Sequence, residues 1–166
     1  MASNRGPLDA WIAPAGAITN AAAGYWTIAT GCRAASSALT AFDTSFAAGL
    51  LEAATQCVAD DRAVLLVAFD VQAAGALASV TTSEGLLAAA LVIAPAGAIT
   101  ASRGPRFEAT LVSGPSAVVP LSSAAARALA RNAMADALPF LEALALGTTG
   151  PLDLPLSRSL SLRLAS

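Results

Sequence analysis

Residues 35–70, ASSALTAFDTSFAAGLLEAATQCVADDRAVLLVAFD, contain the clearest structural pattern in the chain. The run Ala35–Ala41 consists of small and apolar residues with some alternation, which is typical of a short buried strand. Asp43 or Thr44 can cap a helix that follows, because a short side-chain oxygen accepts from the free N–H groups of a first turn. The continuous apolar run Ala63–Phe69 then predicts a central strand that is covered on both faces.

The helix expected between these two strands is apolar almost all round, with only Glu52 and Gln56 as polar tips. A helix with this composition is expected to be buried on nearly every side. Its apolar face consists of Phe46, Leu50, Ala54 and Cys57, with Ala47, Leu51 and Val58 beside them.

The turn between the first strand and this helix is a common location for a nucleophile. Free N–H groups and the positive end of a helix favour a thiolate or an oxyanion at such a turn. The residue here is Phe42, whose side chain has no nucleophilic atom. Phe42 is therefore the main indication that this turn does not supply a catalytic nucleophile.

The composition indicates one domain with a substantial core that neither spans a membrane nor binds nucleic acid. Of the 166 residues 56% are hydrophobic and 12% are charged, the mean hydropathy is +0.67, and the net charge is −2 without a basic cluster. The charge-free runs Ala10–Cys32 and Gly85–Ser102 are interrupted by proline and glycine, so neither predicts a membrane-spanning helix. No signal peptide is recognisable, and a cytoplasmic location is expected.

Several chemistries are excluded by the residue types that the chain lacks. It contains no histidine, which rules out Ser–His and Cys–His nucleophile pairs and removes the commonest general base and metal ligand. The two cysteines, Cys32 and Cys57, have neither the spacing of a metal site nor the pattern of a disulfide framework. The sequence therefore predicts no metal and no cofactor.

The rest of the chain predicts further helices and strands. A helix is expected over Ala21–Thr30, capped by Thr19 or Asn20 and ended by Gly31. Strands are expected over Gly85–Ile93 and Phe107–Val112, the second with one wetter face, and an edge strand over Leu156–Leu164. Ser122 or Ser123 should cap a long helix over Ala124–Leu146, which Pro139 kinks or splits.

These elements suggest three segments: an irregular N-terminal segment over residues 1–17, a domain over residues 18–146 and a tail over residues 147–166. The octamer IAPAGAIT occurs at Ile12–Thr19 and again at Ile93–Thr100. Its flanks differ, so it is not a domain repeat, and it has no functional explanation.

Four quoted stretches together resemble the β-ketoacyl-ACP synthases of the thiolase-like fold. They are NAAAGYWTIATG at Asn20–Gly31, the run from Ser36 to Asp70, EGLLAAALVIAP at Glu84–Pro95 and RFEATLV at Arg106–Val112. In that family a strand ends in a Thr-Ala-Cys turn that opens a buried helix. Laid without gaps, Phe42 takes the place of the cysteine. The resemblance is closest to the ketosynthase-like chain-length factors of aryl-polyene and xanthomonadin-type pigment pathways.

This resemblance implies an α/β fold, namely one half of the thiolase-like layered sandwich. It also implies dimerisation through the strand before the nucleophile, which here consists of Ser36, Ser37, Ala38, Leu39, Thr40 and Ala41. Ketosynthases need the cysteine for the acyl thioester and two histidines for decarboxylation, and this chain has neither at the matching places. Residues 1–17 depart from the family, as expected of a fragment or of a mis-assigned start.

The first functional hypothesis is a non-catalytic subunit that pairs with an active, cysteine-bearing ketosynthase, with an acyl carrier protein as a further candidate partner. Phe42 and Phe46, one helical turn apart, would fill the space that the reactive cysteine and acyl chain occupy in the partner. The plainer interpretation is that both phenylalanines pack in the core, and the two interpretations are compatible.

Two alternatives remain open at this level. One is an acyltransferase with Ser45, Thr44 or Cys32 as nucleophile and Asp43 or Glu84 as base, although no such pair stands at a known spacing. The other is a decayed ketosynthase fragment without activity. An apolar interface strand without a partner is an aggregation-prone edge, so a fragment is expected to be insoluble.

Overall fold

The computed structural model describes residues 21–79, 83–97, 104–148 and 150–166, and it divides the chain into two compact units. The smaller unit spans Met1–Thr40, and its described part contains helix α1, Ala21–Thr30. Gly31 ends this helix with a φ of 66°, which confirms the predicted bounds and the glycine stop. The proposed caps Thr19 and Asn20 and the first IAPAGAIT copy lie outside the described residues.

The larger unit, Ala41–Ser166, contains all the strands of the described chain together with three α-helices and three short 3-10 helices. Its elements in order are η2 (Phe42–Thr44), α2 (Ser45–Ala59), β1 (Val64–Val71), η3 (Gly75–Ser79), β2 (Leu86–Ile93), β3 (Glu108–Ser113), α3 (Ala124–Ala128), η5 (Ala135–Ala137), α4 (Leu138–Leu146), β4 (Leu152–Pro155) and β5 (Leu160–Ala165).

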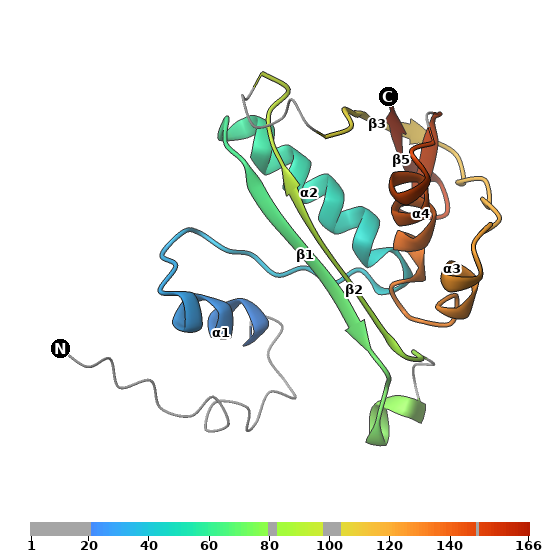
Figure 1. Cartoon of the computed structure of the whole chain (residues 1–166), viewed down its shortest axis with the longest axis horizontal. Coiled ribbons are helices and arrows are strands. Elements are labelled where there is room, and N and C mark those ends of the chain that lie inside the picture. The colour runs from blue at the N-terminus through green and yellow to red at the C-terminus, as the bar shows by residue number, and fades with distance from the viewer. Residues whose placement is uncertain (1–20, 80–82, 98–103, 149) are drawn as a thin grey trace. The chain divides into compact units, whose positions relative to one another are not determined.

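Strands β1 and β2 form an antiparallel pair, with Val64 opposite Ile93 and Val71 opposite Leu86. Helix α2 runs along one face of this pair (Figure 1). Side chains of β1 alternate between partly buried and exposed positions, because within the described part of residues 41–166 only the face against α2 is covered. The prediction of a strand here is confirmed, but the prediction that it is covered on both faces is wrong.

The second sheet has the order β3-β5-β4, and both pairings are antiparallel. The expected C-terminal edge strand is wrong in one respect: the tail folds into two strands, and β5 lies in the middle of the sheet. Its alternation places Leu162 and Leu164 in the core, at 1% and 4% exposure. The tail therefore contributes to the same core as α2.

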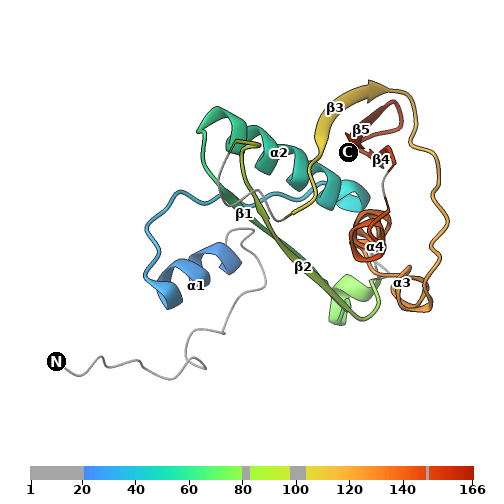
Figure 2. The ribbon, with the colours of Figure 1, turned by 45° about the horizontal axis from the view of Figure 1, so that its top comes forward.

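The core lies where α2 and α4 face the second sheet (Figures 1 and 2). Phe46 and Phe140 pack with their ring centroids 5.7 Å apart, and Phe107 lies on the other side of Phe140 at 5.8 Å. The fully buried side chains of the same core cluster are Ala47, Ala137, Leu154 and Leu162. Val58, expected on the buried side of α2, is 79% exposed, so this helix is not buried all round.

Two further expectations about secondary structure are wrong. The segment Ser36–Ala41 is not a strand and belongs to neither sheet of the described chain. Its alanines and serines also have weak strand propensity. The expected helix over Ala124–Leu146 is interrupted after Ala128, well before Pro139, which occupies the first turn of α4. Proline is well tolerated there, since its missing N–H has no helical partner.

Candidate functional site

The turn that opens α2 has a strained backbone at Phe42. This residue has a φ of 51°, in the left-handed region that a bulky side chain rarely adopts. Its side chain is 94% exposed. Residues in such conformations persist only where the surroundings hold them, and they gather at functional sites. Phe42 is also the residue that the family resemblance aligns with a nucleophile.

Hydrogen bonds from the side chains of Thr44 and Ser45 hold this turn. The Ser45 hydroxyl accepts from the backbone N–H of Ala41 at 2.9 Å and donates to the carbonyl oxygen of Phe42 at 2.7 Å. The Thr44 hydroxyl donates to the carbonyl oxygen of Ala41 at 3.0 Å. Both hydroxyls proposed as nucleophiles therefore have structural partners in the turn.

The group that caps α2 is Asp136 of η5, ninety residues along the chain from Phe46. Its Oδ2 accepts from the backbone N–H of Phe46 at 3.0 Å and from that of Ala47 at 3.1 Å. The side chain of Thr44, at the N-cap position, makes no capping bond. The expectation that Asp43 or Thr44 caps this helix is therefore wrong, because Thr44 bonds back into the turn and a distant carboxylate supplies the acceptor.

Asp136 lies in a poorly solvated position. Its Oδ1 is buried and has no hydrogen-bond partner. Burial raises the pKa of Asp136 to about 6, although backbone N–H groups, those of Ala47 and Phe46 foremost, oppose the rise. At pH 7 the group is therefore largely an anion, placed against the positive end of α2.

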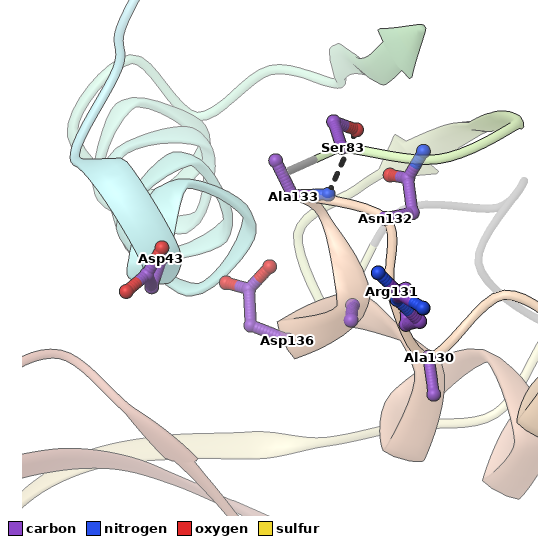
Figure 3. A pocket seen from close by; sticks show the side chains of 8 residues that line it. Asp43, Ser83, Ala130, Arg131, Asn132, Ala133 and Asp136 are labelled. Carbon is purple, nitrogen blue, oxygen red and sulfur yellow. Dashed lines mark hydrogen bonds between the residues drawn. The ribbon is translucent and has the colours of Figure 1, made fainter. Parts of the chain in front are cut away.

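An open pocket of about 350 Å³ lies beside this carboxylate (Figure 3). Asp43 and Asp136 approach it from one side and Arg131 from the other, and the guanidinium of Arg131 pairs with Glu84 at 2.8 Å. The remaining lining residues are Ser83, Ala130, Asn132, Ala133 and Ala135. Because the cation already has a carboxylate partner, the pocket is acidic overall.

A buried serine joins the pocket wall to the first sheet. The Ser83 hydroxyl is hydrogen-bonded to Asp70 of β1 and accepts from the backbone N–H of Ala133 at 3.1 Å. Asn132 donates from Nδ2 to the carbonyl oxygen of Glu84 at 3.0 Å. These contacts hold the segment that carries Asp136 against the end of β2. No local pattern in the sequence indicates these contacts. The Ser83–Asp70 bond joins residues 13 positions apart, and the other two bonds join residues about fifty positions apart.

The residues suggested by sequence are not brought together as a catalytic set. Glu84 is paired with Arg131 and about half exposed, while Asp43 lies across the pocket from Arg131 (Figure 3). Cys32 is exposed and belongs to the unit 1–40, whose placement against the larger unit is not determined. Phe46 is 1% exposed and packs in the core, whereas Phe42 points outward.

Two further classes of site find no support in the described residues. Within the ranges that the structure describes, no three His, Cys, Asp or Glu side chains are grouped as a metal site. Among the helices of that same part of the chain, none is long and apolar enough to cross a membrane.

The sequence matches the family model of the β-ketoacyl synthase N-terminal domain over residues 15–149. No curated protein and no solved structure matches the chain. The mixed helices and sheets form a partial thiolase-like α/β fold, in agreement with this match. The chain therefore belongs to the family of the β-ketoacyl synthase N-terminal domain.

Proposed function

We propose that the chain is a non-catalytic member of this family that pairs with an active β-ketoacyl synthase, in the manner of a chain-length factor. The observation that carries the proposal is Phe42, which stands at a strained turn before a capped helix. The turn has the character of a nucleophile position, but its side chain cannot attack a thioester. No histidine is available to assist decarboxylation.

The exposure of Phe42 favours a role at a contact with another protein. A phenylalanine that is 94% exposed on a strained backbone contributes little to the stability of its own chain. Covered by a partner, it would shape the apolar tunnel in which the partner holds a growing acyl chain. Phe46, which is fixed in the core behind it, would support this position rather than enter the tunnel.

The outer face of the first sheet also supports an assembled state. Every cross-strand pair on this face is apolar, and a contiguous apolar surface of this kind is unusual on a protein that acts alone. The proposed contact segment Ser36–Ala41 comes directly before Phe42 in the chain. The four exposed pairs are Leu65–Val92, Val67–Ala90, Phe69–Ala88 and Val71–Leu86.

The biosynthetic setting is part of the proposal. A chain-length factor limits the product of its ketosynthase in fatty-acid or polyketide-type synthesis, and the sequence resemblance favours aryl-polyene synthesis. An acyl carrier protein that serves the active subunit is a further candidate contact.

Co-expression with the cysteine-bearing ketosynthase from the same gene neighbourhood tests the proposal, with light scattering on the purified material. We expect a one-to-one complex. The variant Phe42→Glu should weaken it at least tenfold, because a carboxylate would be buried in an apolar contact. The control Val118→Glu alters a side chain that is also 94% exposed but lies in a loop away from the turn.

Three other results would contradict the proposal in different ways. A soluble chain that ignores the ketosynthase would exclude pairing. A chain that stays insoluble with and without the ketosynthase would favour the decayed-fragment hypothesis. An adduct on Ser45, Thr44 or Cys32 after incubation with an acyl-phosphopantetheine mimic would show an acyltransferase.

A further inference from the structure

We propose that Asp136 is a resident anion at the N-terminal end of α2, and that it takes from the turn at Phe42 the electrostatic support a thiolate or oxyanion would need. The chain would then carry a second obstacle to catalysis, independent of the phenylalanine. This inference rests on the proposed function only in taking Phe42 as the nucleophile position.

The first turn of α2 has backbone N–H groups that no helical carbonyl accepts. A helix of 15 residues has unpaired N–H groups in its first turn and a partial positive charge there. An anion at that end is stabilised by both, which is how helix ends lower the pKa of reactive thiols. In this chain Oδ2 of Asp136 already accepts from Phe46 and Ala47, at 3.0 and 3.1 Å.

The position of this carboxylate is fixed by its neighbours in the chain. Met134 is 4% exposed and Ala137 is fully buried, so the backbone on both sides of Asp136 belongs to the core. The backbone N–H of Ala133 is held by Ser83. The carboxylate therefore cannot leave the helix end without disturbing core packing.

Among the described residues, no unpaired basic side chain lines the pocket to offset the negative charge of Asp136. The titratable groups that line the pocket with Asp136 are Asp43 on η2 and Arg131 on the segment after α3. Arg131 is paired with Glu84 at 2.8 Å, and Asp43 is itself acidic. Phe42 lies four residues before Phe46, in the turn that leads into α2, so an anion at position 42 would share this helix end with the carboxylate of Asp136, which disfavours its ionisation.

Thiol reactivity at position 42 tests this directly. The substitution Phe42→Cys is made together with Cys32→Ser, which removes the exposed native thiol, while Cys57 is 2% exposed and reacts slowly. The alkylation rate with iodoacetamide is followed from pH 5 to 10. We expect the introduced thiol to react at pH 7 no faster than an unperturbed cysteine, and about tenfold faster once Asp136→Asn is added.

Asparagine is suited to this test because its amide oxygen can still accept from the helix N–H groups. The matched control adds Asp43→Asn in place of Asp136→Asn. Asp43 is exposed, so water screens its charge and the rate should change less than threefold. Circular dichroism checks the fold, and Asp136→Ser gives a second neutral variant should the asparagine variant not fold.

Equal rates with and without Asp136→Asn would overturn the inference, as would a fast thiol in the Phe42→Cys chain alone. The measurement uses the full chain without any ketosynthase. A failure to form the complex therefore leaves it unaffected, and failure of the inference leaves the pairing proposal intact.

Discussion

The N-terminal ends of α2 and α3 are each held by a carboxylate from a later part of the chain, yet the two carboxylates have opposite acidities. Asp136 serves α2, and burial raises its pKa to about 6. Glu142 serves α3: it accepts from Ser122 at 2.9 Å and from Ser123 at 2.7 Å, and hydrogen bonds from these two residues lower its pKa to about 2.

The acidity of these two carboxyl groups follows from their solvation and from the number of hydrogen-bond donors around them, rather than from proximity to a helix end. Both oxygens of Glu142 have donors, and the group is open to water. Only one oxygen of Asp136 has donors, and the other is buried without any. Desolvation disfavours the charged form, and two hydrogen bonds do not fully compensate it.

The largest expected change in the free energy of unfolding comes from removing the Phe46 ring, which packs in the core at the N-terminal end of α2. Phe46→Ala should lower the free energy of unfolding by about 3–5 kcal/mol, because a fully buried ring on Phe140 is lost and a cavity remains. Urea denaturation measures it. The matched control Phe42→Ala removes an exposed ring one turn away and should change stability by less than about 0.5 kcal/mol. Similar losses for both would mean that Phe42 also packs within the chain.

The next effect concerns the pH dependence that Asp136 confers. Its folded pKa lies above the unfolded value, so the folded state binds the proton more tightly. The stabilisation is complete below about pH 4 and is lost as the pH rises through about 6. With solvent screening allowed for, it amounts to about 2 kcal/mol.

Urea denaturation of the wild type and of Asp136→Asn at pH 4, 5, 6 and 7 measures this contribution. The asparagine variant cannot ionise, so it should lack the decline between pH 4 and pH 7. An unchanged slope in the variant would show that Asp136 is not the group responsible.

The smallest effect is expected at the α3 end. Because the folded pKa of Glu142 is lowered, its stabilisation is present above its ordinary pKa and is lost as the pH falls through about 2. Glu142→Gln should therefore destabilise slightly at pH 7 and not at all near pH 2. Water screens this exposed site, so the effect stays below that of Asp136→Asn. A loss that grows on acidification would contradict the comparison.

Local patterns were a good guide where neighbouring residues decide the structure. The bounds of α1 and β2, the strand after α2 and the Ser123 cap of α3 follow from periodicity and capping chemistry. Ser123 accepts from Ala126 at 3.1 Å, as a local cap should. The same reasoning failed for α2, because Thr44 and Ser45 bond back into the turn and leave the helix end to Asp136.

The candidate site was predictable only in part, because several of its residues act through contacts with distant parts of the chain. Phe42 became a candidate because the resemblance aligns it with the nucleophile of the family, and its role there stays a prediction. Asp136, Ser83 and Asn132 could not, since a lone aspartate after Met134-Ala135 carries no motif. Their roles arise from the break between α3 and α4, which itself differs from the helix expected there.

The α/β class, the phenylalanine at position 42 and the lack of histidine in these 166 residues could be read from the sequence, because composition and residue identity do not depend on folding. The folded structure was needed to show which carboxylate meets α2, which face of β1 is exposed and how strained Phe42 is. These properties depend on groups far apart in the chain, and on whether water or protein surrounds them.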